Sequence, residues 1–163
     1  MSDHRDRLVD LSTPEADEPA RVAQVIAWLE SRGWVLDDPD WLDDAPTYRL
    51  GEGLAAVVSG WQAFDAGEGT DVGVCTVCAT PADGDEWMAA LNDWFETGTE
   101  PFLTCTGCAT TSPVGDLDNS AGVVCGRVAL SLQQLDYTFV RDELLSQVRA
   151  ELGGRWSYVH LHV

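Results

Sequence analysis

Two pairs of cysteines with the same internal spacing carry the clearest chemistry of this sequence. The first pair is Cys75 and Cys78, the second is Cys105 and Cys108, and 26 residues separate the pairs. A two-residue gap lets both thiolates of a tight turn point at one ion, and two such turns supply the four soft ligands of a closed tetrahedral site. The spacing therefore predicts one structural zinc ion (Zn2+) per chain, held by these four cysteines.

The surroundings of the two pairs are duplicated as well. Each pair reads Cys-Thr-x-Cys-Ala-Thr, and over about residues 72–115 this arrangement resembles the two knuckles of a zinc ribbon. The usual pattern of that family is Cys-Pro-x-Cys-Gly, whereas Thr76 and Thr106 stand here in place of Pro, and Ala79 and Ala109 in place of Gly. Because Gly commonly takes a left-handed conformation at that point, we expect strain or a different turn geometry at the two alanines.

Iron and redox chemistry are the alternatives for these cysteines. A thioredoxin-type pair needs a helix that begins at its first cysteine, since the helix N-terminus lowers the thiolate pKa. Pro81 and Gly84 follow the first pair, and Pro113 and Gly115 follow the second, so neither pair is expected to start a helix. Four thiolates leave no open coordination position, and we therefore expect the ion to stabilise the fold without catalysing a reaction.

Three further side chains are candidates for chemistry. Cys125 lies in a predicted strand, where a free cysteine is most often a small buried apolar residue. His160 and His162 share one face of another predicted strand, which is how some open metal sites begin. The sequence offers no obvious third ligand, so partly exposed histidines are expected instead. Phosphate-loop, dinucleotide and serine-elbow motifs are absent from the sequence, and no catalytic or cofactor-binding residue is assigned.

Apolar periodicity and turn residues predict an α+β fold: a small mixed sheet with an N-terminal helix, a C-terminal strand-helix-strand unit and an inserted zinc-ribbon-like module. A strand-helix-strand unit usually pairs its strands in parallel. The predicted helices cover residues 17–32, about 87–95 and 138–152. The predicted strands cover residues 48–50, 54–61, 101–104, 123–132 and 156–163.

The domain organisation follows from these elements. Residues 1–16 are expected to be a loose N-terminal segment. Residues 17–71 and 120–163 together are expected to form one α+β domain, into which residues 72–119 are inserted as a subdomain. The acidic run 37–44 lacks the alternating oxygens and central Gly of a calcium loop, so we interpret it as a solvated turn.

Charge narrows the class of partner. The 163-residue chain has a net charge of -19 and contains nine Arg but no Lys, and residues 75–119 hold eight acidic residues and no basic one. Binding to phosphate backbones needs Lys or Arg, so nucleic-acid binding is disfavoured. An acidic surface can instead steer association with a basic protein.

Composition also bears on the compartment and the source. The sequence contains no apolar run long enough for a membrane span and no secretory signal, and five cysteines then favour reduced thiols in the cytoplasm. The Lys-free composition suggests a GC-rich bacterial genome. Residues 11–19, 28–34 and 152–155 resemble small uncharacterised proteins of such bacteria, and the resemblance implies an architecture but no activity.

Two functional hypotheses remain. The first is a non-enzymatic zinc-containing binding or adaptor protein whose acidic surface engages a basic protein partner. The second is a small enzyme or enzyme subunit, with a cleft between the ribbon and the strand-helix-strand unit, in which His160, His162 and Cys125 are the reactive side chains. The sequence does not fix the oligomeric state.

Overall fold

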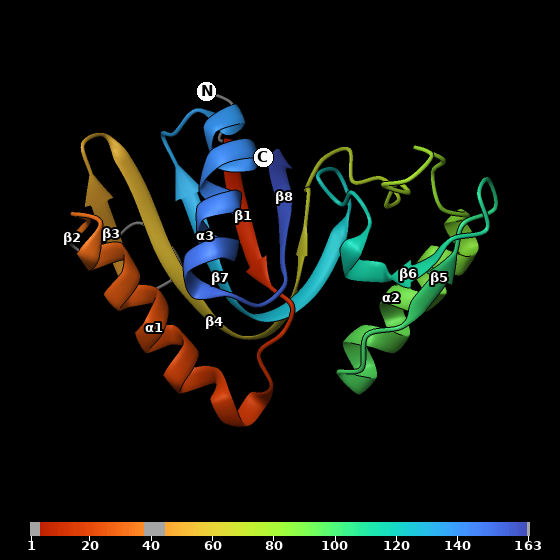
Figure 1. Ribbon diagram of the computed structural model, residues 1–163, viewed down its shortest axis with the longest axis horizontal. Coiled ribbons are helices and arrows are strands. Elements are labelled where there is room, and N and C mark those ends of the chain that lie inside the picture. The colour runs from red at the N-terminus through yellow and green to blue at the C-terminus, as the bar shows by residue number, and fades with distance from the viewer. Residues whose placement is uncertain (1–3, 38–44, 163) are drawn as a thin grey trace.

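The computed structural model describes residues 4–37 and 45–162, and the predicted α+β class is confirmed (Figure 1). The helices are α1 (Glu18–Ser31), α2 (Gly84–Thr97) and α3 (Leu145–Leu152), and a π-helical turn, Phe139–Leu144, leads into α3. The strands are β1 (His4–Asp10), β2 (Val35–Leu36), β3 (Thr47–Leu50), β4 (Gly53–Asp65), β5 (Phe102–Thr104), β6 (Thr111–Pro113), β7 (Val123–Gln133) and β8 (Trp156–His162). Short 3-10 turns cover Glu15–Asp17 and Val114–Asp116. The acidic turn predicted over 37–44 lies, from residue 38 on, outside the described residues.

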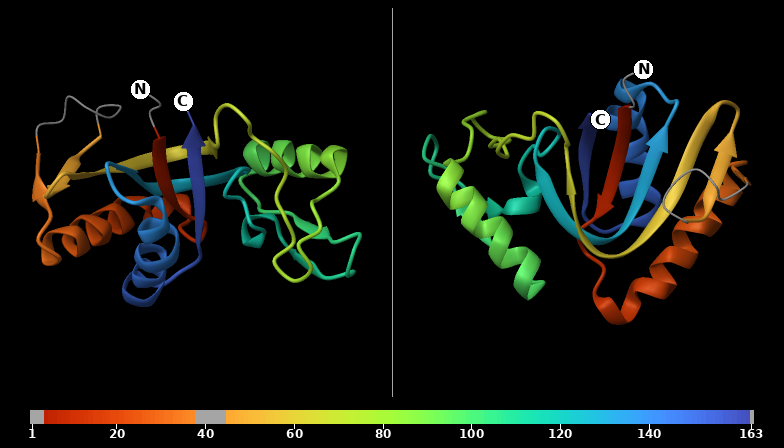
Figure 2. Two further views of the ribbon diagram at one scale, coloured as in Figure 1. Left: turned by 90° about the horizontal axis from the view of Figure 1, so that it is seen from above. Right: turned by 180° about the vertical axis from the view of Figure 1, so that it is seen from behind.

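Six strands form one sheet in the order β2-β3-β4-β7-β1-β8, with α1 and α3 on one face (Figures 1 and 2). The expected strand-helix-strand unit is present as β7, α3 and β8. Its strands run in the same direction but do not pair with each other, because β1 lies between them and is antiparallel to both. The expectation of direct parallel pairing is therefore wrong.

The N-terminal segment differs most from the expectation. Residues 1–16 were expected to be loose, but His4–Asp10 forms β1, an interior strand of the sheet. Leu8 and Val9 are fully buried on its two faces, and the carboxylates of Asp6 and Asp10 are buried as well. The alternating charges of this segment are typical of a solvated chain, and only partners distant in the sequence make the burial of its acids tolerable.

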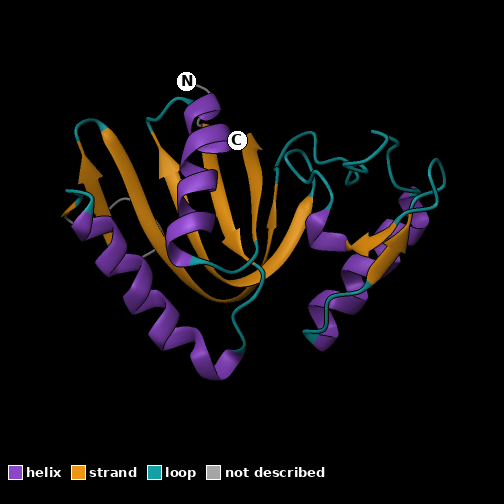
Figure 3. Cartoon of the chain, in the orientation of Figure 1, coloured by secondary structure: helices purple, strands orange, loops and turns teal. Residues whose placement is uncertain are grey.

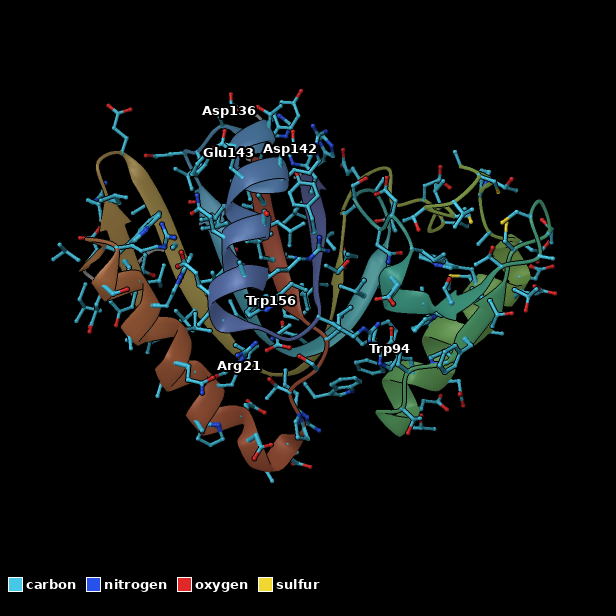
Figure 4. The ribbon with its side chains drawn as sticks, in the orientation of Figure 1. Arg21, Trp94, Asp136, Asp142, Glu143 and Trp156 are labelled. Atoms are coloured by element: carbon cyan, nitrogen blue, oxygen red, sulfur yellow. The ribbon has the colours of Figure 1, made fainter. Side chains whose placement is uncertain are left out.

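The segment that contains the cysteines leaves the sheet at the end of β4 and returns in β7, the two long bent strands of the sheet (Figures 1 and 3). Within it, Asp83 caps α2 by accepting the backbone N–H groups of the first turn, and Gly98 ends the helix in a left-handed conformation. Trp87 and Trp94 belong to the same buried cluster as the sheet residues Val9 and Phe64, so the predicted packing of the α2 apolar face on the main domain is confirmed. Figure 4 shows Trp94 on this helix. The division into a domain and an inserted subdomain stays a prediction.

One arginine fastens this inserted segment to the start of β8. The guanidinium of Arg155 donates to both carboxylate oxygens of Glu100, at 2.6 and 3.0 Å, and to Asp116 at 2.6 Å. The same Glu100 carboxylate accepts the backbone N–H of Gly115 at 2.7 Å. These charge-assisted bonds hold both ends of the β5–β6 hairpin near the sheet.

A buried ion pair lies at the C-terminal end of β1. The carboxylate of Asp10 is 2.5 Å from Nε of Arg21 in α1 and also accepts the hydroxyl protons of Ser12 and Thr13. The Arg21 guanidinium donates to the backbone carbonyls that end α3 and stacks 5.2 Å above the ring of Trp156 (Figure 4). This cluster joins β1, α1, α3 and β8 at one point.

The Asp10→Ala variant should lower the free energy of unfolding by about 3–5 kcal/mol, because it leaves a buried guanidinium without its carboxylate. Urea unfolding followed by circular dichroism measures the change. The matched control is Asp142→Ala, which breaks the exposed pair with Arg141, and it should leave the urea midpoint almost unchanged. Equal effects of the two substitutions would contradict this assignment.

Candidate metal centre

The four predicted cysteine ligands lie together. Their sulfur atoms are all within 4.8 Å of one another, with Cys75 Sγ 3.7 Å from Cys108 Sγ and Cys78 Sγ 3.5 Å from Cys105 Sγ. All four are free thiols, and these separations are far longer than the roughly 2 Å of a disulfide bond.

The donor set fits a zinc ion. Zinc–sulfur bonds of about 2.3 Å in a tetrahedron place neighbouring sulfurs about 3.8 Å apart, which is close to the two measured contacts. Four thiolates are the donors of closed structural zinc sites, whereas exchangeable catalytic sites keep one position for water. Cys75, Cys78, Cys105 and Cys108 would therefore hold one structural ion, and the arrangement is that of a metal-binding protein.

The backbone of the two knuckles follows the same path despite the missing glycines. Ala79 and Ala109 both have φ of 60°, and the backbone N–H of each donates to the carbonyl of the first cysteine of its pair at 2.9 Å. The two alanines therefore take the left-handed conformation that Gly usually supplies, at a cost of about 1–2 kcal/mol each. We expected either strain or a different turn geometry at these two alanines, and the structure shows the usual geometry with strain.

Side chains beyond the ligands complete the centre. The hydroxyl of Thr80 lies 3.1 Å from Cys78 Sγ, and the hydroxyl of Thr110 lies 3.2 Å from Cys108 Sγ. A hydroxyl at this position can donate to a thiolate and favour it over the thiol. The two Cys-Thr-x-Cys-Ala-Thr repeats thus supply their own outer hydrogen bonds.

The single difference between the repeats has a steric cause. Val77 of the first knuckle is 68% exposed, and its counterpart in the second knuckle is Gly107. A Cβ at Gly107 would lie 2.3 Å from Thr80 Oγ1 and 3.2 Å from Cys78 Sγ. The first knuckle therefore packs over the second where only Gly fits.

The electrostatics of the centre favour thiolates at three of the four ligands. The hydroxyl of Thr80 lowers the pKa of Cys78, and the hydroxyl of Thr110 lowers the pKa of Cys108. Backbone N–H groups, first that of Cys108, lower the pKa of Cys105. At Cys75, backbone N–H groups also favour the thiolate, but burial and the neighbouring thiols outweigh them and raise its pKa.

The remaining cysteine is part of the core, as predicted. Cys125 is 1% exposed and lies in the hydrophobic cluster that contains Trp87 and Trp94. Burial, with a smaller contribution from the charge of Glu100, raises the pKa of Cys125 to about 12. The thiol therefore stays protonated near neutral pH and is a poor nucleophile.

His160 and His162 occupy a different environment from Cys125. Both line a pocket at the end of β8, and their rings meet edge-to-face at 4.4 Å. The sequence reading missed that β1 brings His4 and Asp6 to the same pocket. His4, Asp6 and Leu8 alternate along β1 as His162, His160 and Tyr158 alternate along β8. This pattern is visible in the sequence, but it indicates a shared site only if the two strands pair.

Comparison with known proteins adds no relative: no protein-family model, no curated protein and no solved structure matches this chain. The resemblance to zinc ribbons and to small proteins of GC-rich bacteria receives no support from these comparisons. Among the described residues, no helix is long and apolar enough to cross a membrane.

Replacing either strained alanine by glycine should stabilise the zinc-loaded protein. Ala79→Gly and Ala109→Gly remove a left-handed penalty of about 1–2 kcal/mol, and part of this gain is offset by the greater freedom of Gly in the unfolded chain. We expect a net increase of about 0.5–1 kcal/mol in the free energy of unfolding for each, measured by urea titration.

The control is the same chemical change in a right-handed helix. Ala89 is exposed in the interior of α2, and Ala89→Gly should reduce the free energy of unfolding by about 1 kcal/mol. A loss of stability at the knuckles similar to that at Ala89 would contradict the assigned geometry.

Proposed function

We propose that this chain is a zinc-dependent binding protein, in which a closed tetrathiolate zinc centre shapes an acidic module that engages a basic protein partner. The single observation that supports a structural role for the ion is a cluster of four sulfurs within 4.8 Å of one another, which no histidine or carboxylate of the described residues joins. Such a shell leaves no position for a substrate. A reducing compartment such as the cytoplasm would keep these thiols available for the metal.

The charge of the inserted segment supports a basic partner. Its charged side chains within residues 75–119 are all acidic, and those of α2 are exposed. A four-thiolate zinc centre adds two further negative charges. Met88, Phe95 and Phe102 on the same segment are 51%, 49% and 66% exposed, so a partner with both basic and apolar side chains would find complementary contacts.

Removing the zinc should loosen this segment selectively. A strong chelator is expected to raise amide hydrogen exchange over residues 72–119 while β1 and β8 stay protected, because the knuckles lose the ion that joins them. Cys78→Ala should have the same effect, although this side chain is exposed and belongs to neither hydrophobic cluster. Cys125→Ala is the matched control and should keep the zinc. Protection that persists after the metal has left would contradict a structural role.

Neutralising the acids of α2 should weaken partner binding more than neutralising acids elsewhere. Two fourfold variants are compared at equal net charge. The test variant changes Asp85, Glu86, Asp93 and Glu96 to their amides, and the control changes Asp17, Glu52, Glu68 and Glu143 to theirs. The immobilised protein should retain a basic protein in a salt-dependent manner, and only the test variant should lose most of it. Equal losses in both variants would show that binding depends on net charge alone, and would contradict a specific role for the acids of α2.

A second candidate function, a small enzyme, is favoured by one observation. The pocket that contains His160 and His162 is lined mainly by β1, by the start of the C-terminal helix and by β8, and Asp118 at the end of the inserted segment completes its wall. Its position differs from that of the expected cleft between the ribbon and the strand-helix-strand unit, because none of residues 72–115, all of which the structure describes, lines it. Cys125 belongs to the core and drops out of that hypothesis.

A further inference from the structure

All three histidines of the chain meet at one edge of the sheet. His4 comes from β1, and His160 and His162 come from β8, more than 150 positions away in the sequence. The ring centroids of His4 lie 5.4 Å from His160 and 4.9 Å from His162. One ring nitrogen from each of the three lies within 4.8 Å of the others.

Backbone pairing fixes this arrangement. His4 is the register partner of His162, and Asp6 is the register partner of His160, so the four side chains project from the same face of the sheet. The backbone N–H of His160 donates to the carbonyl of Ser120 at 2.8 Å, and that of His162 donates to Ala66 at 3.0 Å. Both edges of β8 are therefore bonded, which fixes the backbone positions from which His160 and His162 project.

A buried carboxylate stands behind the histidines. Asp6 is 5% exposed, and its Oδ1 lies 2.6 Å from Nδ1 of His160 and accepts the Tyr158 hydroxyl proton at 2.6 Å. A metal-bound imidazole generally donates its second N–H to such a carboxylate, which fixes the tautomer and increases ligand strength. With Nδ1 engaged, Nε2 is the atom with which His160 would bind an ion.

The space in front of the histidines is large enough for further ligands. The pocket has a volume of about 820 Å³, and its walls include Tyr137 and Arg141 at the start of the C-terminal helix. His4 and His162 are exposed to it, and His160 is half-buried. Three histidines on an open pocket differ from the four-cysteine centre, whose coordination shell would be full.

We propose that His4, His160 and His162 form a second metal site, which binds a divalent transition-metal ion such as zinc and leaves at least one coordination position open to water from the pocket. Three neutral imidazoles with an open fourth position are a donor set of exchangeable and catalytic zinc sites. Zinc–nitrogen bonds of about 2.0–2.1 Å require nitrogens about 3.4 Å apart. Binding would draw the ring nitrogens, which lie within 4.8 Å of one another, to that separation by rotation of the exposed His4 and His162 side chains. Asp6 acts as a positioning residue.

The test uses untagged full-length protein, since an added histidine tag would bind the same metals. After the cysteine centre has been loaded and weakly bound metal dialysed away, calorimetric titration with zinc should reveal one additional ion per chain. The double variant His4→Gln/His162→Gln should lose this ion and keep the cysteine-bound one, and both side chains are exposed enough for the fold to tolerate the change. Gln134→Ala, which changes the same pocket without removing an imidazole, is the matched control and should bind normally.

A second measurement needs no variant. With nitrogen-labelled histidine only three imidazole spin systems exist, and all three should shift together and saturate at one equivalent of zinc. Asp6→Asn should weaken zinc binding by about 10–100-fold without changing its stoichiometry, which a loss of folding would not produce. Absence of a second ion, or binding that leaves any of the three imidazoles unshifted, would overturn the proposal.

The outcome is independent of the proposed structural zinc. Cys78→Ala should abolish the first ion and leave the histidine-bound ion in place. If the protein binds zinc only through the cysteines, the proposed structural zinc stands and the histidine site is refuted. If it binds zinc only through the histidines, the histidine site stands and the proposed structural zinc is refuted.

Discussion

The antiparallel pairing of β1 with β8 is the constraint on which most of the molecule depends. It places the first described strand inside the sheet, aligns His4 and Asp6 with His162 and His160, and brings Asp10 opposite Trp156. Because side chains alternate along a strand, a shift of one residue in this ladder would send all of these groups to the other face. The ion pair of Asp10 with Arg21 fixes one end of the ladder, and the hydrogen bonds of Asp6 fix the middle.

The two clusters of potential metal ligands are built in opposite ways. The cysteines come from two short local turns, and each turn supplies its own threonine hydroxyl, so the centre is a property of about forty consecutive residues. The histidines come from the two ends of the chain and depend on the whole sheet. The segment after the second knuckle connects the clusters: Asp118 exchanges backbone hydrogen bonds with Val74, next to Cys75, and Ser120 accepts the N–H of His160.

This difference explains what could be predicted from the sequence. The four cysteine ligands, α2 with its Gly98 cap, and the strands at 48–50 and 123–132 follow from local spacing and periodicity, which a single sequence displays. The loose N-terminus was a wrong prediction because Arg5, Asp6, Arg7 and Asp10 are typical of a solvated segment. The burial of Asp6 and Asp10 depends on Tyr158, His160 and Arg21, and no local pattern indicates these partners. The third histidine was missed for the same reason.

The place of β1 in the sheet also has a consequence during synthesis. As the ribosome releases the chain, Leu8 and Val9 emerge well before both neighbours of their strand, β7 and β8, which follow only at Val123–Gln133 and Trp156–His162. The nascent protein must therefore keep an apolar strand unpaired until β7 and β8 have been made. Such delayed long-range closure slows folding and exposes strand edges to other chains. The cysteine knuckles, by contrast, can capture an ion while the C-terminal strands are still inside the exit tunnel.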